Sequence, residues 1–162
     1  MSRGMKISPE LLEALVGLCR LALPGKAFGL ISGPAPGCAE EIYPMRKNLR
    51  EVSPVVNRLF EAYGEFYRDP DRGFCFDPRE FAEVEGQIRR KDRRVVAVYH
   101  SHRVLPAAPT QVDRDLHYSP DLFMVIVSVA DPDAPAVEVF KKEGESFVRS
   151  TLEREGCSAR AR

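Results

Sequence analysis

The sequence lacks the features that mark several specialised classes of protein. It has no net charge, with 24 Lys and Arg residues against 24 Asp and Glu residues. It therefore lacks the basic excess with which proteins bind nucleic acids or anionic membrane surfaces. Its longest uninterrupted apolar stretch, 122–127, is far shorter than the roughly 20 residues that span a bilayer. We expect a protein that binds neither nucleic acid nor membrane.

The cysteines lack any Cys-x-x-Cys spacing, which excludes a zinc knuckle and a thioredoxin-type motif. They lie far apart in the chain, at Cys19, Cys38, Cys75 and Cys157. No secretory signal accompanies them, because Glu13 and Arg20 interrupt the apolar stretch near the N-terminus. We therefore expect reduced cysteines in a soluble, cytoplasmic protein.

The chain of 162 residues has the size of one domain, and it contains no repeat or low-complexity tract. The last ten residues have little apolar content. We predict a single domain over residues 1–152 and a flexible C-terminal tail over residues 153–162.

Hydrophobic periodicity and turn signals predict an irregular alternation of helices and strands. Helices are expected over 9–23, 55–67 and 78–91, with a short one from about Thr110. Strands are expected over 27–32, 41–45, 94–99, 122–129, 136–140 and 146–152. Frequent hairpins favour an α/β domain with a mixed, largely antiparallel β-sheet flanked by helices.

All three histidines lie in one short stretch of the chain. His100 and His102 end a predicted strand at i and i+2, so both imidazoles point to the same face. They supply two ligands for a divalent metal, and Asp113 beyond the next loop is the candidate third. Alternatively, Thr110 and Asp113 are a capping box that only begins a helix. His117 is expected to be a surface residue.

The sequence around these residues resembles the JAMM signature of the MPN-domain family. That signature reads H-x-H-P, six residues, S, two residues and D; here it corresponds to the segment 98–103 followed by Thr110 and Asp113. The segment 26–33 resembles the first strand of the family, and Asn48 matches its usual asparagine. Two further segments, 76–80 and 123–128, resemble its pre-helix segment and the strand after the motif. The resemblance covers about residues 8–150 and implies an MPN/JAMM-like fold with cytidine-deaminase-like layering.

The resemblance also implies a chemistry. It implies that His100, His102 and Asp113 bind Zn²⁺ in a metallo-isopeptidase of the prokaryotic single-domain type. Thr110 occupies the serine position, where its hydroxyl would hydrogen-bond the developing oxyanion. Family members of this type cleave after the C-terminal Gly of a ubiquitin-like or sulfur-carrier protein, so the tail of such a protein is the implied partner.

Two positions depart from the family pattern. Arg103 replaces the proline, which carries no chemistry. Lys26 replaces the catalytic glutamate, and an ammonium cannot accept a proton. Three readings follow: a weak or inactive site that still binds zinc, a substitute carboxylate, or Lys26 itself acting as base with a lowered pKa. Glu40 and Glu41 belong to the neighbouring strand, but hairpin register places both well away from Lys26, so neither is named as the base. The alternative function is a non-catalytic MPN scaffold that binds a protein partner.

Overall fold

A six-stranded sheet forms the centre of the molecule, with the strand order β3-β2-β4-β5-β6-β7. Strands β4 and β5 pair in parallel, and the other neighbours in this sheet pair antiparallel. The expected mixed, largely antiparallel sheet is therefore confirmed. The computed structural model describes residues 4–157, and the strands of this sheet are β2 (Phe28–Gly33), β3 (Glu41–Pro44), β4 (Arg94–His102), β5 (Phe123–Ser128), β6 (Ala136–Glu143) and β7 (Ser146–Ser150).

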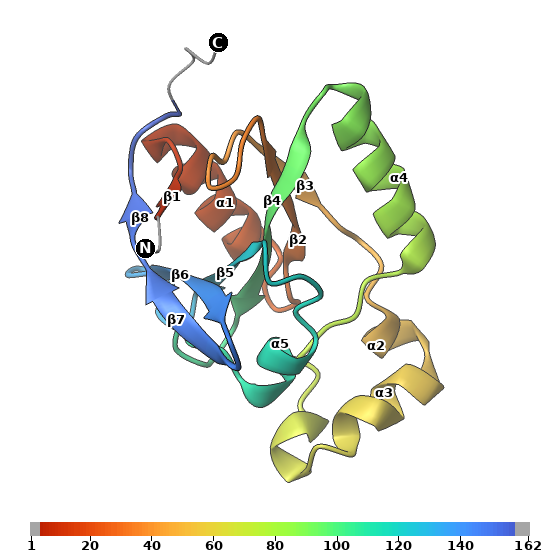
Figure 1. Cartoon of the computed structure of the whole chain (residues 1–162). Helices are drawn as coiled ribbons and strands as arrows, with labels where there is room; N and C mark the ends of the chain where they lie inside the picture. The colour runs from red at the N-terminus through yellow and green to blue at the C-terminus, as the bar shows by residue number, and fades with distance from the viewer. Residues whose placement is uncertain (1–3, 158–162) are drawn as a thin grey trace.

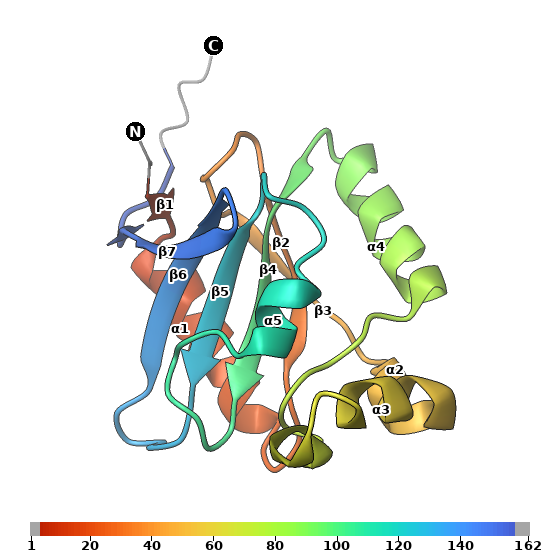
Figure 2. The same ribbon diagram turned by 60° about the horizontal axis from the view of Figure 1, so that its bottom comes forward.

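Helices cover both faces of this sheet (Figure 1). Figure 2 shows α1 behind the sheet and α4 and α5 on the other side. The described helices are α1 (Pro9–Leu21), α2 (Leu49–Val52), α3 (Pro54–Glu61), α4 (Pro78–Arg90) and α5 (Gln111–Asp115), with a 3-10 turn, η1 (Glu65–Arg68). The longest of them has 13 residues, and none of the described helices is long and apolar enough to cross a membrane.

Local signals start the two long helices as expected. The hydroxyl of Ser8 accepts a hydrogen bond from the Leu11 amide at the start of α1, and the carboxylate of Asp77 accepts one from the Glu80 amide at the start of α4. A proline occupies the first turn of each helix. The helix expected over 55–67 is interrupted, because Gly64 has a φ of 125° between α3 and η1.

Strand β4 contributes to two separate cores because its side chains alternate between the faces of the sheet. Ala97 and Tyr99 pack in the core under α1, whereas Val98 packs in the core under α4. His100 and His102 follow Val98 at intervals of two. They therefore end the same row of side chains, on the face that α4 and α5 cover.

The chain ends form a second, small sheet that the sequence pattern did not predict. Strand β1 (Met5–Lys6) pairs in parallel with β8 (Leu152–Glu153). Lys6 also forms a β-bridge with Cys38. The domain boundary predicted at residue 152 stays a prediction, and residues 158–162 of the expected tail lie outside the described residues.

Cys38 and Cys157 form a disulfide, with their Cα atoms 5.7 Å apart. The expectation of reduced cysteines is wrong for this pair. Both cysteines reach the same place because β1 lies between the segments that carry them. This pairing joins positions separated by 119 residues, so no local spacing could indicate it. Cys19 and Cys75 are free thiols.

The disulfide should contribute measurably to stability. It closes a loop across 119 positions, and the chain-entropy model assigns a loop of that size up to about 5 kcal/mol. We expect Cys157→Ser to lower the free energy of unfolding by up to this amount in urea denaturation without reductant. Cys75→Ser is the matched control, because it leaves the disulfide intact and should respond to reductant as the wild type does. Four reactive thiols in the unfolded, non-reduced wild type would contradict the pairing.

Candidate metal centre

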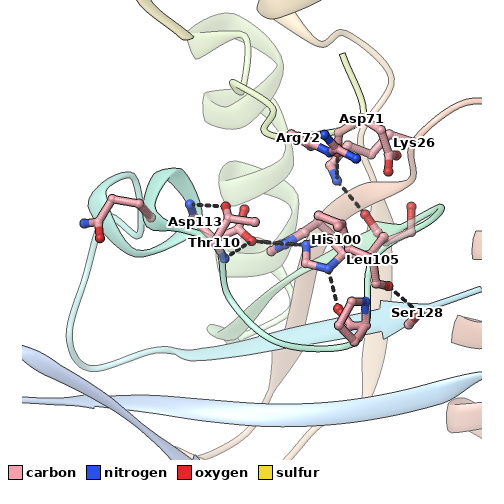
Figure 3. A network of polar contacts seen from close by, with 12 residues as sticks. Lys26, Asp71, Arg72, His100, Leu105, Thr110, Asp113 and Ser128 are labelled. Atoms are coloured by element: carbon pink, nitrogen blue, oxygen red, sulfur yellow. Dashed lines mark hydrogen bonds and ion pairs between the residues drawn. The ribbon is translucent and has the colours of Figure 1, made fainter. Parts of the chain in front are cut away.

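Three side chains from two elements converge beside the end of β4 (Figure 3). The Nε2 atoms of His100 and His102 lie 3.2 Å apart. The Oδ2 atom of Asp113, from α5, lies 3.2 Å from the first of these nitrogens and 3.1 Å from the second. The three residues are only 2%, 1% and 6% exposed. The structure thus brings together the three residues that the sequence singled out, in a cluster whose ligand atoms all lie within 4.8 Å of one another.

The backbone fixes which nitrogen of His102 faces the cluster. Its Nδ1 lies 2.8 Å from the carbonyl oxygen of Pro106. A carbonyl oxygen only accepts, so Nδ1 carries the proton and donates it. The Nε2 atom then presents its lone pair to the cluster, as an imidazole that ligates a metal must.

Asp113 and Thr110 form the capping box that the sequence offered as the alternative to a metal site. The Asp113 amide donates to the Thr110 hydroxyl oxygen at 3.2 Å, and the Thr110 amide donates to Asp113 Oδ2 at 2.9 Å. The same Oδ2 atom lies beside both histidines. The cap therefore does not compete with the cluster: it sets the orientation of the carboxylate within it. The role of Thr110 in catalysis stays a prediction.

The electrostatics of the cluster suit a metal cation at neutral pH. Burial lowers the pKa of His100 to about 4, helped by the nearby charge of Lys26 and by His102, so its imidazole is neutral. Burial alone would raise the pKa of Asp113, but the facing imidazoles hold it well below its ordinary value. The cluster thus presents neutral imidazole nitrogens and an ionised carboxylate.

Lys26 is partly buried and acts as a hydrogen-bond donor between two segments. Its ammonium donates to the backbone carbonyl of Asp71 at 2.9 Å and to that of Ser101 at 2.5 Å. Figure 3 shows Lys26 beside Asp71. Burial lowers the pKa of Lys26. Both contacts use its N–H groups, so this residue ties the loop around Asp71 to the end of β4.

A second contact between the same segments was not found from the sequence. Asp71 is 5% exposed, and its Oδ2 atom accepts a hydrogen bond from the Arg103 amide at 3.0 Å. The Arg103 side chain also reaches Asp69, at 3.4 Å. The residue in place of the family's proline therefore anchors the loop over 69–72 next to His102. No local pattern signals this contact, because Asp71 and Arg103 lie 32 residues apart.

The structure rules out Glu40 and Glu41 as substitute carboxylates. Ser32 is opposite Glu41 across β2 and β3, whereas Phe28, at the other end of β2, is opposite His100. Each glutamate forms an ion pair at the distant end of the sheet, Glu40 with Arg93 and Glu41 with Lys91.

His117 is not the surface residue that the sequence predicted. It is partly buried, and its Nε2 atom lies 2.9 Å from the carbonyl oxygen of Leu122. Its ring packs edge-on against Phe147, with 5.5 Å between the ring centroids. It takes no part in the cluster of His100, His102 and Asp113, because the short helix turns its side chain toward β5 and β7.

A pocket of about 190 Å³ lies beside the cluster. His100 and Asp113 belong to its wall, and most of the other lining residues are apolar or aromatic. The three side chains of the cluster are therefore almost inaccessible to solvent, and two of them border this cavity.

Mixed-sheet topology and a His-His-Asp cluster at the end of a strand define a class of α/β domain with a candidate metal centre. The family model for prokaryotic homologues of the JAB domain matches residues 8–141. The chain therefore belongs to the prokaryotic JAB-domain family, which confirms the resemblance to JAMM/MPN proteins. No curated protein matches the chain.

Three solved structures illustrate the similarity in fold. A protein from Desulfitobacterium hafniense has a TM-score of 0.74 at 24% identity, covering 97% of each chain. A protein from Salinibacter ruber has a TM-score of 0.60 at 21% identity, covering 93% of this chain and 90% of its own. A JAB1/MPN domain protein from Archaeoglobus fulgidus has a TM-score of 0.54 at 17% identity, covering 94% of this chain and 99% of its own. These likenesses confirm the fold.

The lowered pKa of His100 predicts how stability depends on pH. Between an ordinary pKa of 6.5 and a native value of about 4, the unfolded chain binds more protons than the native protein. Stability must therefore fall as the pH falls through this window. We expect the free energy of unfolding of the zinc-free protein to drop by about 2 kcal/mol from about pH 6.5 to pH 5, in urea denaturation.

The variant His100→Gln removes the titrating group and keeps a polar side chain of similar length. Its free energy of unfolding should fall less over the same pH range. Part of the fall remains in both proteins, because burial also lowers the pKa of His117. A wild type whose stability is flat in this window would contradict a buried, neutral His100.

Proposed function

We propose that this protein binds one Zn²⁺ ion through His100, His102 and Asp113 and is a metallopeptidase of the JAMM type. The observation that carries the proposal is the convergence of three buried ligand atoms within 4.8 Å. Two imidazole nitrogens and one carboxylate oxygen are a donor set that catalytic zinc sites use, with one position left for water. The proton on His102 Nδ1, held by Pro106, supports the same assignment.

The proposed reaction is hydrolysis of the amide bond after the C-terminal Gly of a ubiquitin-like or sulfur-carrier protein. When bound, zinc would lower the pKa of a coordinated water to about 7. The chain's own residues would orient the reactants. The Thr110 hydroxyl accepts a hydrogen bond from the Asp113 amide and keeps its own proton to donate to a developing oxyanion.

Lys26 limits the rate that we assign to this site. Its N–H groups donate to two backbone carbonyls, and as an ammonium it supplies no proton acceptor. Burial lowers its pKa toward the neutral amine, so Lys26 acting as the base itself stays a prediction. Glu40 and Glu41 lie at the far end of the sheet, so neither replaces the missing glutamate. We therefore propose slow turnover. The second candidate is a non-catalytic scaffold, which the tethering role of Lys26 favours.

Zinc content tests the proposed metal centre. We expect about one equivalent per chain in the wild type, measured by elemental analysis after dialysis against metal-free buffer. Asp113→Asn should lose it, because the amide removes the charge but keeps an oxygen for the Thr110 cap. His117→Ala is the matched control and should retain the metal. Equal zinc content in Asp113→Asn and the wild type would contradict the ligand assignment.

The rate limitation by Lys26 has its own test. We expect Lys26→Glu to raise cleavage of a Gly-Gly-tailed ubiquitin-like fusion by about 100-fold, since general bases typically contribute about 10²–10⁴-fold. Lys26→Gln also replaces the ammonium but supplies no base, so it should stay near the wild-type rate. Rates are compared for folded, zinc-loaded protein. No gain in Lys26→Glu would favour the non-catalytic scaffold.

A further inference from the structure

The pocket beside the metal centre is built to hold an apolar group. Its apolar lining residues include Phe74, Phe76, Val98, Val112 and Met124. Its volume of about 190 Å³ compares with a cavity of about 150 Å³ that holds benzene in another protein. A branched aliphatic side chain or one aromatic ring therefore fits.

The rim of the pocket is apolar as well. Leu116 and Tyr118 line it and are 50% and 48% exposed. The Tyr118 ring packs edge-on against Phe81 at 5.3 Å, and burial raises its pKa to about 12, so it carries no charge at neutral pH. Asp113 is the one charged group among the described lining residues, and its carboxylate is turned to the histidines. His100 and His117 also line the pocket, and burial lowers the pKa of both imidazoles, so neither offers a positive charge to an acidic side chain at neutral pH.

The position of the pocket relates it to the scissile bond. His100 and Asp113 belong both to the ligand cluster and to the pocket wall. A group in the pocket therefore lies directly beside whatever the cluster acts on. The proposed function puts Gly on the acyl side of the bond, and Gly has no side chain. The nearest residue with a side chain that can fill the pocket is then the one across the bond, on the amine side.

We propose that this pocket selects an apolar side chain on the residue that follows the scissile bond. The inference rests on the proposed function and narrows its substrates to Gly–Xaa peptide bonds in which Xaa is Leu, Phe or a similar residue. A charged side chain at this position would lose its hydration without gaining a partner. The protein would thus process a ubiquitin-like precursor or fusion at an apolar junction.

The test compares zinc-loaded wild type on fusions that differ only in the residue after the Gly-Gly tail. We expect kcat/KM for Leu to exceed that for Asp by at least about 10-fold, the order that an apolar subsite supplies. Cys75 lines the pocket and is partly buried, so Cys75→Met fills the pocket whereas Cys75→Ala does not. The Leu-to-Asp ratio should collapse toward unity in Cys75→Met and persist in Cys75→Ala.

A binding measurement separates this inference from the proposed function. N-acetyl-leucinamide, titrated into the zinc-loaded protein, should shift the methyl resonance of Met124 in NMR spectra, and N-acetyl-aspartamide should not. Cleavage without preference for Leu, or no shift with leucinamide, would overturn the pocket assignment while leaving the proposed function in place. A shift with leucinamide but no cleavage of any fusion supports apolar selection by the pocket and removes the proposed activity instead.

Discussion

The parallel pairing of β4 with β5 is the constraint on which the candidate site depends. Two strands joined by a tight turn pair antiparallel, whereas a parallel pair needs a connection that crosses back over a face of the sheet. Here that connection runs over residues 103–122, on the face covered by α4 and α5. It contains α5, and α5 carries Asp113. The topology therefore delivers a carboxylate to the end of the strand that supplies both histidines.

The end of β4 is held in place from several directions. Lys26 and Arg103 connect it to the loop around Asp71, through backbone and side-chain contacts. The hydroxyl of Ser128, at the end of β5, donates to the Leu105 carbonyl at 2.6 Å and holds the start of the crossing loop (Figure 3). Metal ligands require this kind of support, because small errors in their geometry weaken binding. Lys26 thus acts as a structural tether between the end of β4 and the loop around Asp71.

The alternation of the β4 side chains between the two faces of the sheet links the core to the candidate site. One row of its side chains, including Tyr99, packs under α1, and the other row leads from Val98 to the histidines. Burial of the histidines on this second row keeps the His100 imidazole neutral, so that a ring nitrogen has a lone pair for a metal ion. The apolar surroundings that do this continue into the neighbouring pocket. The same apolar surroundings therefore keep the candidate ligand His100 neutral and favour an apolar group in the pocket beside it.

Features that depend on neighbours a few residues apart could be predicted from the sequence. The caps at Ser8 and Asp77, the common face of His100 and His102, and the capping box at Thr110 all follow from spacings of two to three residues. Asp113 was the candidate third ligand by its place after the loop, the family motif agreed with it, and the structure brings all three residues together. Family membership and fold could be predicted because these signals occur in the right order along most of the chain.

Contacts between distant segments could not be predicted from the sequence, and the folded structure shows them. It bonded Cys38 to Cys157, set Asp71 against Arg103, and showed that Lys26 donates to two carbonyls. Hairpin register already put Glu40 and Glu41 away from Lys26, and the assembled sheet confirms it. These contacts depend on how helices and strands pack in three dimensions, and the local pattern of residues does not indicate that packing.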